Sequence, residues 1–240
     1  MPPTENQPPP AAAPRVHPWT IWAIVITIVL GMVVGYNYII YKVRGDYEKE
    51  LTEGRRPPIL HRLETDFEGV ERSGKAVQLS QLKGKIMVAG YVFTRCPRGC
   101  AGVVAIMKLL QREFGDDPRF QLLSFSLDAK HDTPAVLRQF AGAQGVAGDN
   151  WWFLTGDQTA IRDYMTNVFK FYPVQDVPEA DRVGDSDLYA HDMRLAIVDH
   201  RGHVRGFYEV MHPQMSDIFY DNLVRDLKKL FQEADEAAAR

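Results

Sequence analysis

Two cysteines, Cys96 and Cys100, are the residues whose type and spacing suggest chemistry. They are the only cysteines among 240 residues, and three residues separate them. Two thiolates at this spacing can form a disulfide with each other or hold a metal ion together. The alternative interpretation is that both are ordinary buried core residues, as free cysteines often are.

The residues on either side of the cysteines favour a reactive pair. An apolar run over 85–93, with the length of a buried strand, precedes them, and a run over 103–114 that stops at Gly115 predicts a helix after them. The cysteines therefore lie at a strand-to-helix turn, a place where ligands collect in α/β sheets. A thiol at a helix N-terminus beside Arg95 and Arg98 is expected to have a lowered pKa and more thiolate.

The remaining patterns place this turn in an α/β fold. The strand and helix around the cysteines continue into a strand over 120–127, which makes a parallel strand–helix–strand unit. The other expected elements are a hairpin over 66–79, a helix from Pro134 with Thr133 as N-cap, a strand at 151–154, a helix over 158–171, an exposed loop over 173–187, an antiparallel hairpin of 195–199 with 204–210, and a last helix from Ser216. This order predicts a thioredoxin-like α/β sandwich.

The N-terminal part of the chain predicts a membrane anchor. Residues 19–41 contain no charged side chain and are long enough to cross about 30 Å of hydrocarbon as a helix, with aromatic residues near both ends. A signal peptide or a buried core helix fits this length and composition less well. We therefore expect a disordered Pro- and Ala-rich tail at 1–18, a transmembrane helix at 19–41, a juxtamembrane linker at 42–60 and a folded domain at 61–240.

The charges of the chain limit its partners and bear on its orientation. The net charge is −3 and no run rich in Lys or Arg stands out, which argues against nucleic acid as a partner. Basic residues near the expected span are more numerous on its C-terminal side, which taken alone favours a cytoplasmic domain. That rule is weak for large domains, which cross the membrane largely regardless of charge.

A metal site at the cysteines would need a further ligand, and the histidines are the candidates. His200 and His203 flank the turn at Arg201 and Gly202, and histidines in turns are usually solvated. His191 precedes the strand at 195–199, which in a thioredoxin-like topology runs antiparallel to the cysteine strand. His191 is therefore expected near Cys96 and Cys100, although a lone histidine is more often a hydrogen-bonded surface or core residue.

Several motifs in a fixed order resemble one known family. These are F-T-R-C-P-R-G-C at 93–100, S-L-D-A-K-H-D-T-P at 126–134 and L-T-G at 154–156. His191 also stands eleven residues before Gly202, as the copper-binding histidine of that family stands before the glycine of its hairpin. Over roughly residues 65–233 the chain thus resembles the Sco/SenC family of copper-binding cytochrome c oxidase assembly proteins.

The resemblance implies a function and a set of site residues. Copper, as Cu(I) or Cu(II), would be bound by Cys96, Cys100 and His191, and the two cysteines would also form a redox-active disulfide. Two thiolates and an imidazole suit copper, although three protein ligands with water would also suit a catalytic zinc. The protein would be a single-pass inner (cytoplasmic) membrane protein with its C-terminal domain in the periplasm or an equivalent compartment. It would be a chaperone rather than an enzyme, delivering copper to the copper-site subunit of cytochrome c oxidase or to another copper acceptor.

The sequence departs from the family pattern at a few positions, and two other functions compete. Arg98 stands where an acidic residue is common, Ala101 where proline is usual, and Ala190 precedes the histidine where aspartate is usual; such neighbours tune a metal site. A membrane-tethered thiol–disulfide oxidoreductase that reduces an acceptor's cysteines is the alternative function. Dedicated oxidoreductases usually carry C-x-x-C, and thiol exchange gives His191 no role. A thioredoxin-like peroxidase fits least, because the residues around Cys96 match the copper family.

Overall fold

The computed structural model describes residues 17–52, 56–97 and 100–239, and the chain divides into two units, 1–55 and 56–240. Each unit is described by itself. Most of the expected N-terminal tail, residues 1–16, lies outside the described residues, and so does Arg98.

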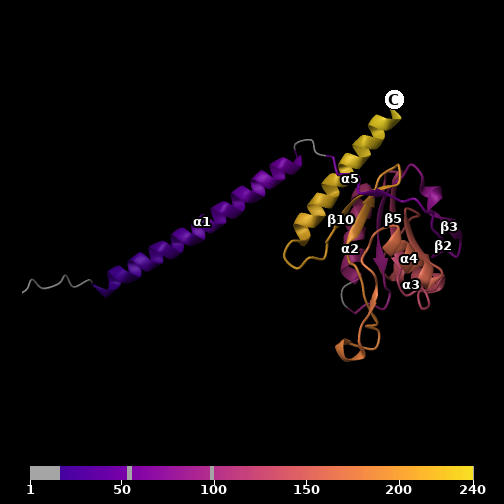
Figure 1. Ribbon diagram of the computed structural model, residues 1–240, viewed down its shortest axis with the longest axis horizontal. Helices are drawn as coiled ribbons and strands as arrows, with labels where there is room; N and C mark the ends of the chain where they lie inside the picture. Colours follow the sequence, from indigo (N-terminus) through magenta and orange to yellow (C-terminus); the bar gives the residue numbers. More distant parts are fainter. Residues whose placement is uncertain (1–16, 53–55, 98–99, 240) are drawn as a thin grey trace, which may run out of the picture. The chain divides into compact units, whose positions relative to one another are not determined.

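The first unit contains one long helix, α1, over Pro18–Thr52, which Figure 1 shows as a single uninterrupted rod. By length and composition its segment Trp19–Gly45 is able to cross a membrane, with a mean hydropathy of 2.2. Its large apolar side chains, Trp22 and Leu30 among them, are exposed along the helix. The helix continues beyond Tyr41 through much of the expected linker, because the residues that follow include several good helix formers such as Lys42 and Arg44.

The second unit is built on an eight-stranded mixed sheet in the order β1-β10-β9-β4-β5-β6-β2-β3. β4, β5 and β6 run parallel in its centre, and every other pairing in it is antiparallel. The strands are β1 His61–Arg62, β2 Glu68–Glu71, β3 Ala76–Gln78, β4 Ile86–Val92, β5 Phe120–Ser126, β6 Trp151–Thr155, β9 Leu195–Val198 and β10 His203–Tyr208. This confirms the parallel unit around the cysteines and the antiparallel hairpin that follows His191.

Helices cover both faces of this sheet. They are α2 Cys100–Phe114, α3 Pro134–Ala143, α4 Gln158–Asn167 and α5 Ser216–Ala238, with 3-10 turns at η1 Leu79–Leu82 and η2 Glu179–Asp181. α2, α3 and α5 pack on one face, and α4 packs on the other with η1. Because both faces are covered, every residue of β4 and β5 is buried, as is usual for the central strands of an α/β sheet.

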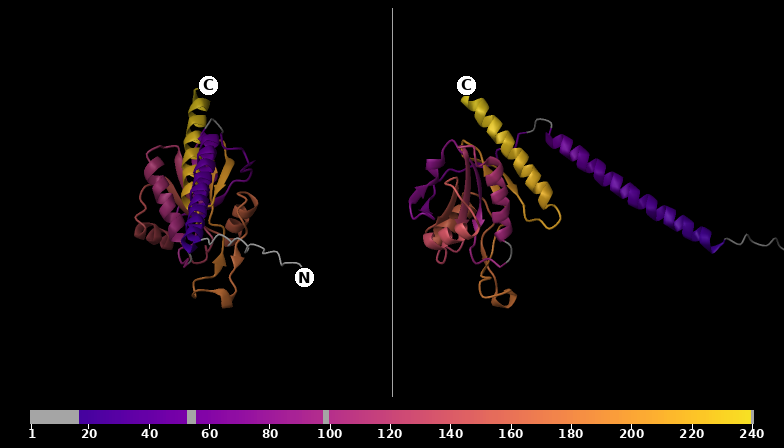
Figure 2. Two further views of the ribbon diagram at one scale, coloured as in Figure 1. Left: turned by 90° about the vertical axis from the view of Figure 1, so that its left-hand side faces the viewer. Right: turned by 180° about the vertical axis from the view of Figure 1, so that it is seen from behind.

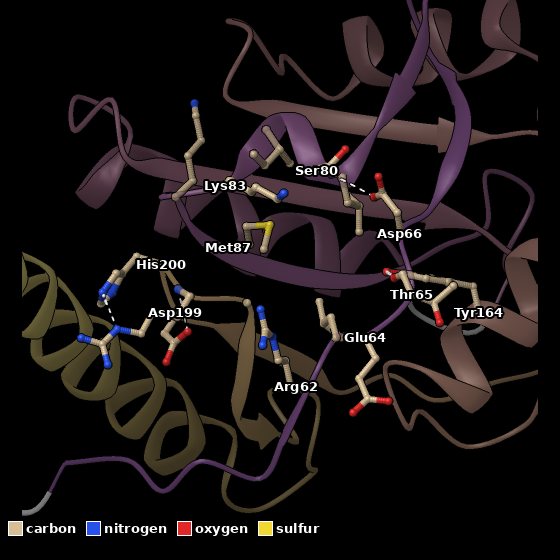
Figure 3. Close-up of a pocket in the computed structure, with 16 residues that line it drawn as sticks. Arg62, Glu64, Thr65, Asp66, Ser80, Lys83, Met87, Tyr164, Asp199 and His200 are labelled. Atoms are coloured by element: carbon tan, nitrogen blue, oxygen red, sulfur yellow. Dashed lines mark hydrogen bonds between the residues drawn. The ribbon is translucent and has the colours of Figure 1, made fainter.

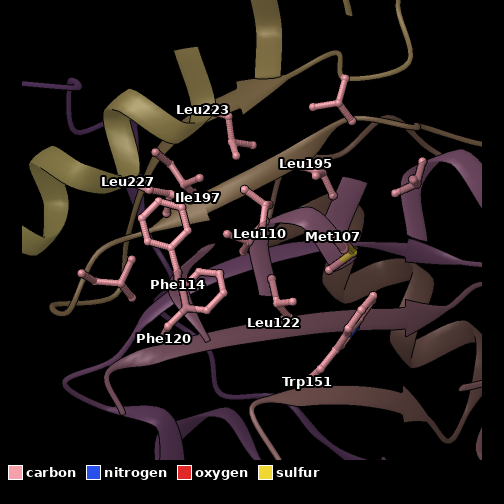
Figure 4. Packing of buried hydrophobic residues seen from close by; sticks show 14 of the residues in the cluster. Met107, Leu110, Phe114, Phe120, Leu122, Trp151, Leu195, Ile197, Leu223 and Leu227 are labelled. Carbon is pink, nitrogen blue, oxygen red and sulfur yellow. The ribbon is translucent and has the colours of Figure 1, made fainter. Parts of the chain in front are cut away.

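The face that carries α2 holds the larger hydrophobic cluster. Figure 4 shows side chains of α2 and α5 meeting those of β5, β6 and β9. From α2, Val103, Met107, Leu110 and Phe114 recur at helical spacing and are buried. Fully burying one such side chain contributes roughly 1.5–3 kcal/mol, so this stripe holds α2 firmly on the sheet. Cys100, the first residue of α2, is thereby held at one end of a well-packed element.

The helix expected over 158–171 is shorter than predicted. α4 ends at Asn167, and the chain reverses through Lys170, which has a φ of 68° in the left-handed region. The Phe171 N–H then donates to the Met165 carbonyl at 2.9 Å. Phe169 and Phe171 remain buried after the helix has ended. The apolar pattern therefore continued past the end of the helix, which explains the error.

The acidic segment expected as a loop over 173–187 contains secondary structure. β7 (Gln175–Asp176) pairs antiparallel with β8 (Tyr189–Ala190) to form a separate two-stranded ribbon. In both views of Figure 2 this ribbon projects beyond the end of the main sheet. Two-residue strands are too short to show alternation in a sequence, so the ribbon was not predicted. Its second strand leads directly into His191.

The folded unit also begins earlier than His61. Pro57 is buried, and its carbonyl accepts a hydrogen bond from Nε of Arg205 at 3.0 Å. The Leu60 N–H donates to the Val204 carbonyl at 2.9 Å, just before β1 pairs with β10. Residues from Arg56 onward therefore belong to the second unit.

Candidate metal centre

The turn that carries the cysteines leaves the end of β4. The Cys96 N–H donates to the Phe93 carbonyl at 3.0 Å, and the Cys96 side chain is half-buried against the cluster on the α4 face. Cys100 is the first residue of α2, as the sequence predicted. Its side chain lies outside the described part of the structure. The positive end of a helix dipole stabilises a thiolate at such a position.

A buried carboxylate holds this turn in place through hydrogen bonds. Asp132 is fully buried and accepts hydrogen bonds from the backbone N–H and the hydroxyl of Thr94. The Ser126 hydroxyl donates to the same carboxylate at 2.8 Å, and Nδ1 of His131 lies 3.1 Å from it. The segment 126–134, which carries the second motif of the resemblance, therefore pins the residues just before Cys96.

Arg95 has a different environment from the one the sequence suggested. Its guanidinium forms an ion pair with the buried carboxylate of Asp128, with 2.6 Å between Nη2 and Oδ2. The charge of Arg95 is therefore balanced by Asp128, and the pair acts as a second anchor for the turn. The other cation expected beside the thiols, Arg98, lies outside the described residues.

His191 lies at the same end of the sheet as the cysteine turn. β9 runs antiparallel to β4, with Ala89 opposite Ala196, so the segment entering β9 lies beside the chain leaving β4. The ring of His191 is half-buried and packs edge-on against Tyr91 of β4, with ring centroids 5.8 Å apart. The topology therefore places His191 next to β4, the strand that leads into the Cys96 turn.

A hydrogen bond orients the imidazole of His191. Its Nδ1 lies 2.9 Å from the backbone carbonyl of Asp192. A carbonyl oxygen only accepts hydrogen bonds, so Nδ1 carries the proton and Nε2 of the neutral ring holds the lone pair. Fixing one ring nitrogen on a carbonyl is the usual way in which proteins orient a metal-binding histidine.

The residue after His191 anchors the loop. The buried carboxylate of Asp192 accepts from the Tyr172 N–H at 2.9 Å and pairs with the Arg194 guanidinium at 2.6 Å. Arg194 in turn stacks on the rings of Tyr172 and Phe207. Burial alone would lower the pKa of Arg194, but its hydrogen bonds and charge pairing with Asp192 raise that pKa. The Arg194 guanidinium therefore stays charged, and its contact with Asp192 holds the segment that follows His191.

Aromatic contacts fix the segment before His191. Tyr189 of β8 packs on Phe93 with ring centroids 5.7 Å apart, and the Arg162 guanidinium lies 4.3 Å from the Tyr189 ring. Arg162 also donates to the Leu127 carbonyl at 2.8 Å. Tyr91 of β4 and Phe93, which directly follows β4, thus each contact a ring from the segment 189–191. Sequence reasoning missed Tyr91, Tyr189 and Arg194 as supporting residues, and the only available signal was the aromatic alternation at 91 and 93.

The other histidines singled out from the sequence lie at the opposite end of the sheet. Nδ1 of His203 pairs with Asp199 at 3.2 Å, in the turn where β9 ends. A cavity of about 680 Å³ opens at that end, and Figure 3 shows His200, Asp199, Arg62 and Lys83 among the residues that line it. Two of its carboxylates accept hydrogen bonds from the backbone, Asp199 from the His203 N–H and Asp66 from the Ser80 N–H, each at 2.9 Å.

Among the side chains that the structure describes, no three His, Cys, Asp or Glu residues gather as a metal site. The thiol of Cys100, one of the three predicted ligands, is not one of those side chains. The described part of the centre therefore consists of the Cys96 turn, the start of α2 and the oriented imidazole of His191.

Comparison with known proteins identifies relatives of this domain. The sequence profile of the SCO1/SenC family matches residues 57–225. A SCO1 protein homolog from Bacillus subtilis (strain 168) is 29% identical over 175 residues, which cover 72% of this chain and 84% of that protein.

Solved structures are similar over the same region. A SCO1/SenC family lipoprotein from Bacillus anthracis str. Ames superposes with a TM-score of 0.61 at 27% identity, covering 73% of this chain and 99% of that one. BsSco, a member of the Sco family of cytochrome c oxidase assembly proteins, gives a TM-score of 0.59 at 28% identity, covering 73% and 98%. ScoI of Bradyrhizobium japonicum, solved with copper bound, gives 0.53 at 21% identity, covering 67% and 98%, and at that identity shows the fold alone. These likenesses confirm the thioredoxin-like α/β sandwich.

Proposed function

Because the chain belongs to the SCO1/SenC family, we propose that it is a membrane-anchored copper chaperone that helps assemble cytochrome c oxidase. Copper is its cargo, bound by Cys96, Cys100 and His191 and passed to the copper-site subunit of the oxidase or to another copper acceptor. BsSco, one of its relatives, belongs to a family of cytochrome c oxidase assembly proteins, and the more distant ScoI holds copper in its structure.

The observation that carries the proposal is the orientation of His191. Its Nδ1 proton is held by the Asp192 carbonyl, which leaves Nε2 as the nitrogen able to bind a metal. The Tyr91 ring holds this imidazole against the strand that ends at the Cys96 turn.

The donor set suits the cargo. Two thiolates and one imidazole are soft and intermediate ligands that favour Cu(I) and also hold Cu(II). The start of α2 at Cys100 favours the thiolate form, which is the form that binds metal. The buried supports at Asp132 and Asp192 keep the two ligand-bearing segments in place without occupying a coordination position.

The anchor in this proposal is α1. No part of its apolar segment is buried, an arrangement that water disfavours and hydrocarbon stabilises. We place the second unit on the outer side of the inner membrane, as the family resemblance implies, because oxidising conditions are found there and large domains escape the basic-residue rule.

A second candidate is a membrane-tethered thiol–disulfide reductase that keeps the cysteines of an acceptor reduced. The position of Cys96 and Cys100 at a strand-to-helix turn favours it, and BsSco, 28% identical, is a protein in which a disulfide switch was identified. Thiol exchange depends mainly on thiolate character and access, so His191 separates the two functions.

Anaerobic Cu(I) titration of the full-length protein in detergent tests the proposal. We expect one tightly bound copper per chain, and loss of stable binding in Cys96→Ser, Cys100→Ser and His191→Ala. His200→Ala and His203→Ala serve as controls, because those residues lie at the other end of the sheet, and both should bind as the wild type does. Retention of copper by His191→Ala together with its loss in His203→Ala would refute the ligand assignment.

A further inference from the structure

A cavity of about 350 Å³ opens directly beside His191, and two methionines line it. Met193 comes from the segment that enters β9, and Met211 comes from the segment that follows β10. Both side chains are half-buried and rest on the hydrophobic cluster beneath α2 and α5. Their thioethers therefore reach a solvent-connected space that His191 also lines.

Met211 lies against the first turn of the cysteine helix. A Cβ atom added at Gly102 would lie 2.8 Å from Sδ of Met211 and closer still to its Cε. Gly102 therefore lets the end of the Met211 side chain rest directly on the backbone of α2. Gly102 is two residues from Cys100, and Met193 is two residues from His191. Met211 thus contacts the helix that begins at Cys100, and both methionines line the same cavity as His191.

The chemistry of these groups selects a particular ion. Thioether sulfur is a soft, neutral ligand that suits Cu(I), whereas oxygen ligands suit Mg²⁺ and Ca²⁺. His212, the other histidine that lines the cavity, is not arranged to bind the same ion through Nε2. Its Nδ1 accepts a hydrogen bond from the Gln214 N–H at 3.2 Å, so Nε2 carries the proton of the neutral ring.

We propose that Met193 and Met211, with Nε2 of His191, form a transient binding position for Cu(I) at the entrance to the proposed copper site. This inference rests on the proposed function and adds the path by which copper moves. Copper stays in the Cu(I) state throughout, and the step is an exchange of ligands in which a thioether replaces a thiolate while the imidazole is kept. Because a thioether binds more weakly than a thiolate, the position speeds transfer to a partner with soft ligands without retaining the ion.

The alternative role of the two methionines is packing alone, since methionine often fills gaps beside a core. Leucine has nearly the same volume and keeps such packing, but it has no sulfur. A Met193→Leu, Met211→Leu double variant therefore removes the proposed ligands and leaves the hydrophobic contacts. Met215→Leu is the matched control, because Met215 is exposed, lies close by in the chain and does not line the cavity.

The first measurement is the rate at which full-length protein in detergent, loaded with one Cu(I), transfers it to bathocuproine disulfonate. The double variant should bind copper at equilibrium within a few-fold of the wild type. Its transfer rate should fall roughly tenfold, which corresponds to losing about 1.4 kcal/mol of stabilisation of the intermediate. Met215→Leu should transfer at the wild-type rate. An unchanged rate in the double variant would overturn the proposal.

The second measurement works without the thiolates and so separates this inference from the proposed function. Ag(I), a diamagnetic substitute for Cu(I), is added to methyl-labelled Cys96→Ser, Cys100→Ser protein and the methionine methyl resonances are recorded. Shifts confined to Met193 and Met211 are expected. If the methionine methyl resonances do not shift, or if Met215 shifts equally, the proposed transient binding position is overturned even if the wild type binds one copper. Failure of the wild type to bind copper would instead refute the proposed function.

Discussion

The ring of His191 packs edge-on against the ring of Tyr91, with centroids 5.8 Å apart and planes inclined at 73°. Tyr91 belongs to β4, the strand that leads into the Cys96 turn, whereas His191 follows β8. Burial raises the pKa of Tyr91 well above its ordinary value, so its hydroxyl stays neutral and the ring acts as a packing surface. One aromatic contact thus links the two segments that carry the proposed copper ligands.

Removing the Tyr91 ring should weaken copper binding although every ligand remains. An edge-on ring pair is worth about 0.5–1.5 kcal/mol, so Tyr91→Leu should lower Cu(I) affinity by up to roughly tenfold. Tyr91→Phe keeps the ring and should bind as the wild type does. Chelator competition measures both affinities. Tyr164→Leu is the control, because Tyr164 is also a buried tyrosine on this face but packs on Phe67. An equal loss of affinity in the Tyr164 variant would show that general destabilisation is the cause.

Asp132 should be the most sensitive of the supporting residues. Asp132→Ala leaves the hydroxyls of Thr94 and Ser126 and the Thr94 N–H without their buried acceptor. We expect the free energy of unfolding to fall by about 3 kcal/mol, measured by urea denaturation. Asp157→Ala removes an exposed N-cap of α4 and should cost only about 1 kcal/mol. Equal losses in the two variants would contradict a special role for Asp132.

Acid should destabilise the domain partly through Asp199. Burial by itself would raise the pKa of this carboxyl, but hydrogen bonds from the His203 backbone and the Arg205 guanidinium lower it. A lowered folded-state pKa gives stability that is complete above the ordinary pKa of about 3.9 and is lost as the pH falls through the folded value. Urea midpoints measured from about pH 6 down to pH 2 should therefore fall less steeply in Asp199→Asn than in the wild type.

Asp117 provides the comparison for this pH effect. Hydrogen bonds from Arg119 also lower the pKa of Asp117, but this pair is about a third exposed and solvent weakens it. Asp117→Asn should therefore change the acid dependence less than Asp199→Asn does. The opposite order of the two variants would show that the buried network around Arg205 is not the main acid-sensitive element.

The proposed orientation predicts the behaviour of a reporter. An enzyme that is active only outside the cytoplasm, fused after Arg240, should be active, because the second unit is placed on the outer side of the membrane. The same reporter fused before Met1 should be inactive. A stable C-terminal fusion without activity would favour the orientation indicated by the basic residues on the C-terminal side of the apolar span.

The redox state of the cysteines should control copper binding. A disulfide between Cys96 and Cys100 would offer no thiolate, so oxidised protein should not bind Cu(I) and reduction should restore binding. The chaperone and the reductase share this expectation. They differ in His191→Ala, which should abolish oxidase copper loading in cells while leaving disulfide exchange of the purified protein with a model dithiol within a few-fold. Normal oxidase activity in that strain under limiting copper would favour the reductase.

Local patterns were sufficient to predict the elements around the cysteines. The apolar run over 85–93 became β4, and the periodic run after the cysteines became α2. Both predictions succeeded because a buried strand or helix shows a characteristic spacing of apolar residues within one continuous segment of sequence. The N-cap at Thr133, whose hydroxyl accepts from the Val136 N–H, and the apolar α1 were readable for the same reason.

Pairings between distant segments were decided only by the tertiary structure. The sequence marked Arg95 as a cation beside a thiol, but the fold brings Asp128 to it, and no local pattern encodes that contact. The two-residue strands β7 and β8 exist because they pair with each other, and they are too short to leave a period. The order of strands expected from the sequence already placed His191 at the end of the sheet where the Cys96 turn lies. The orientation of its ring arises from Tyr91 and the Asp192 carbonyl, because side-chain contacts are selected by packing in three dimensions.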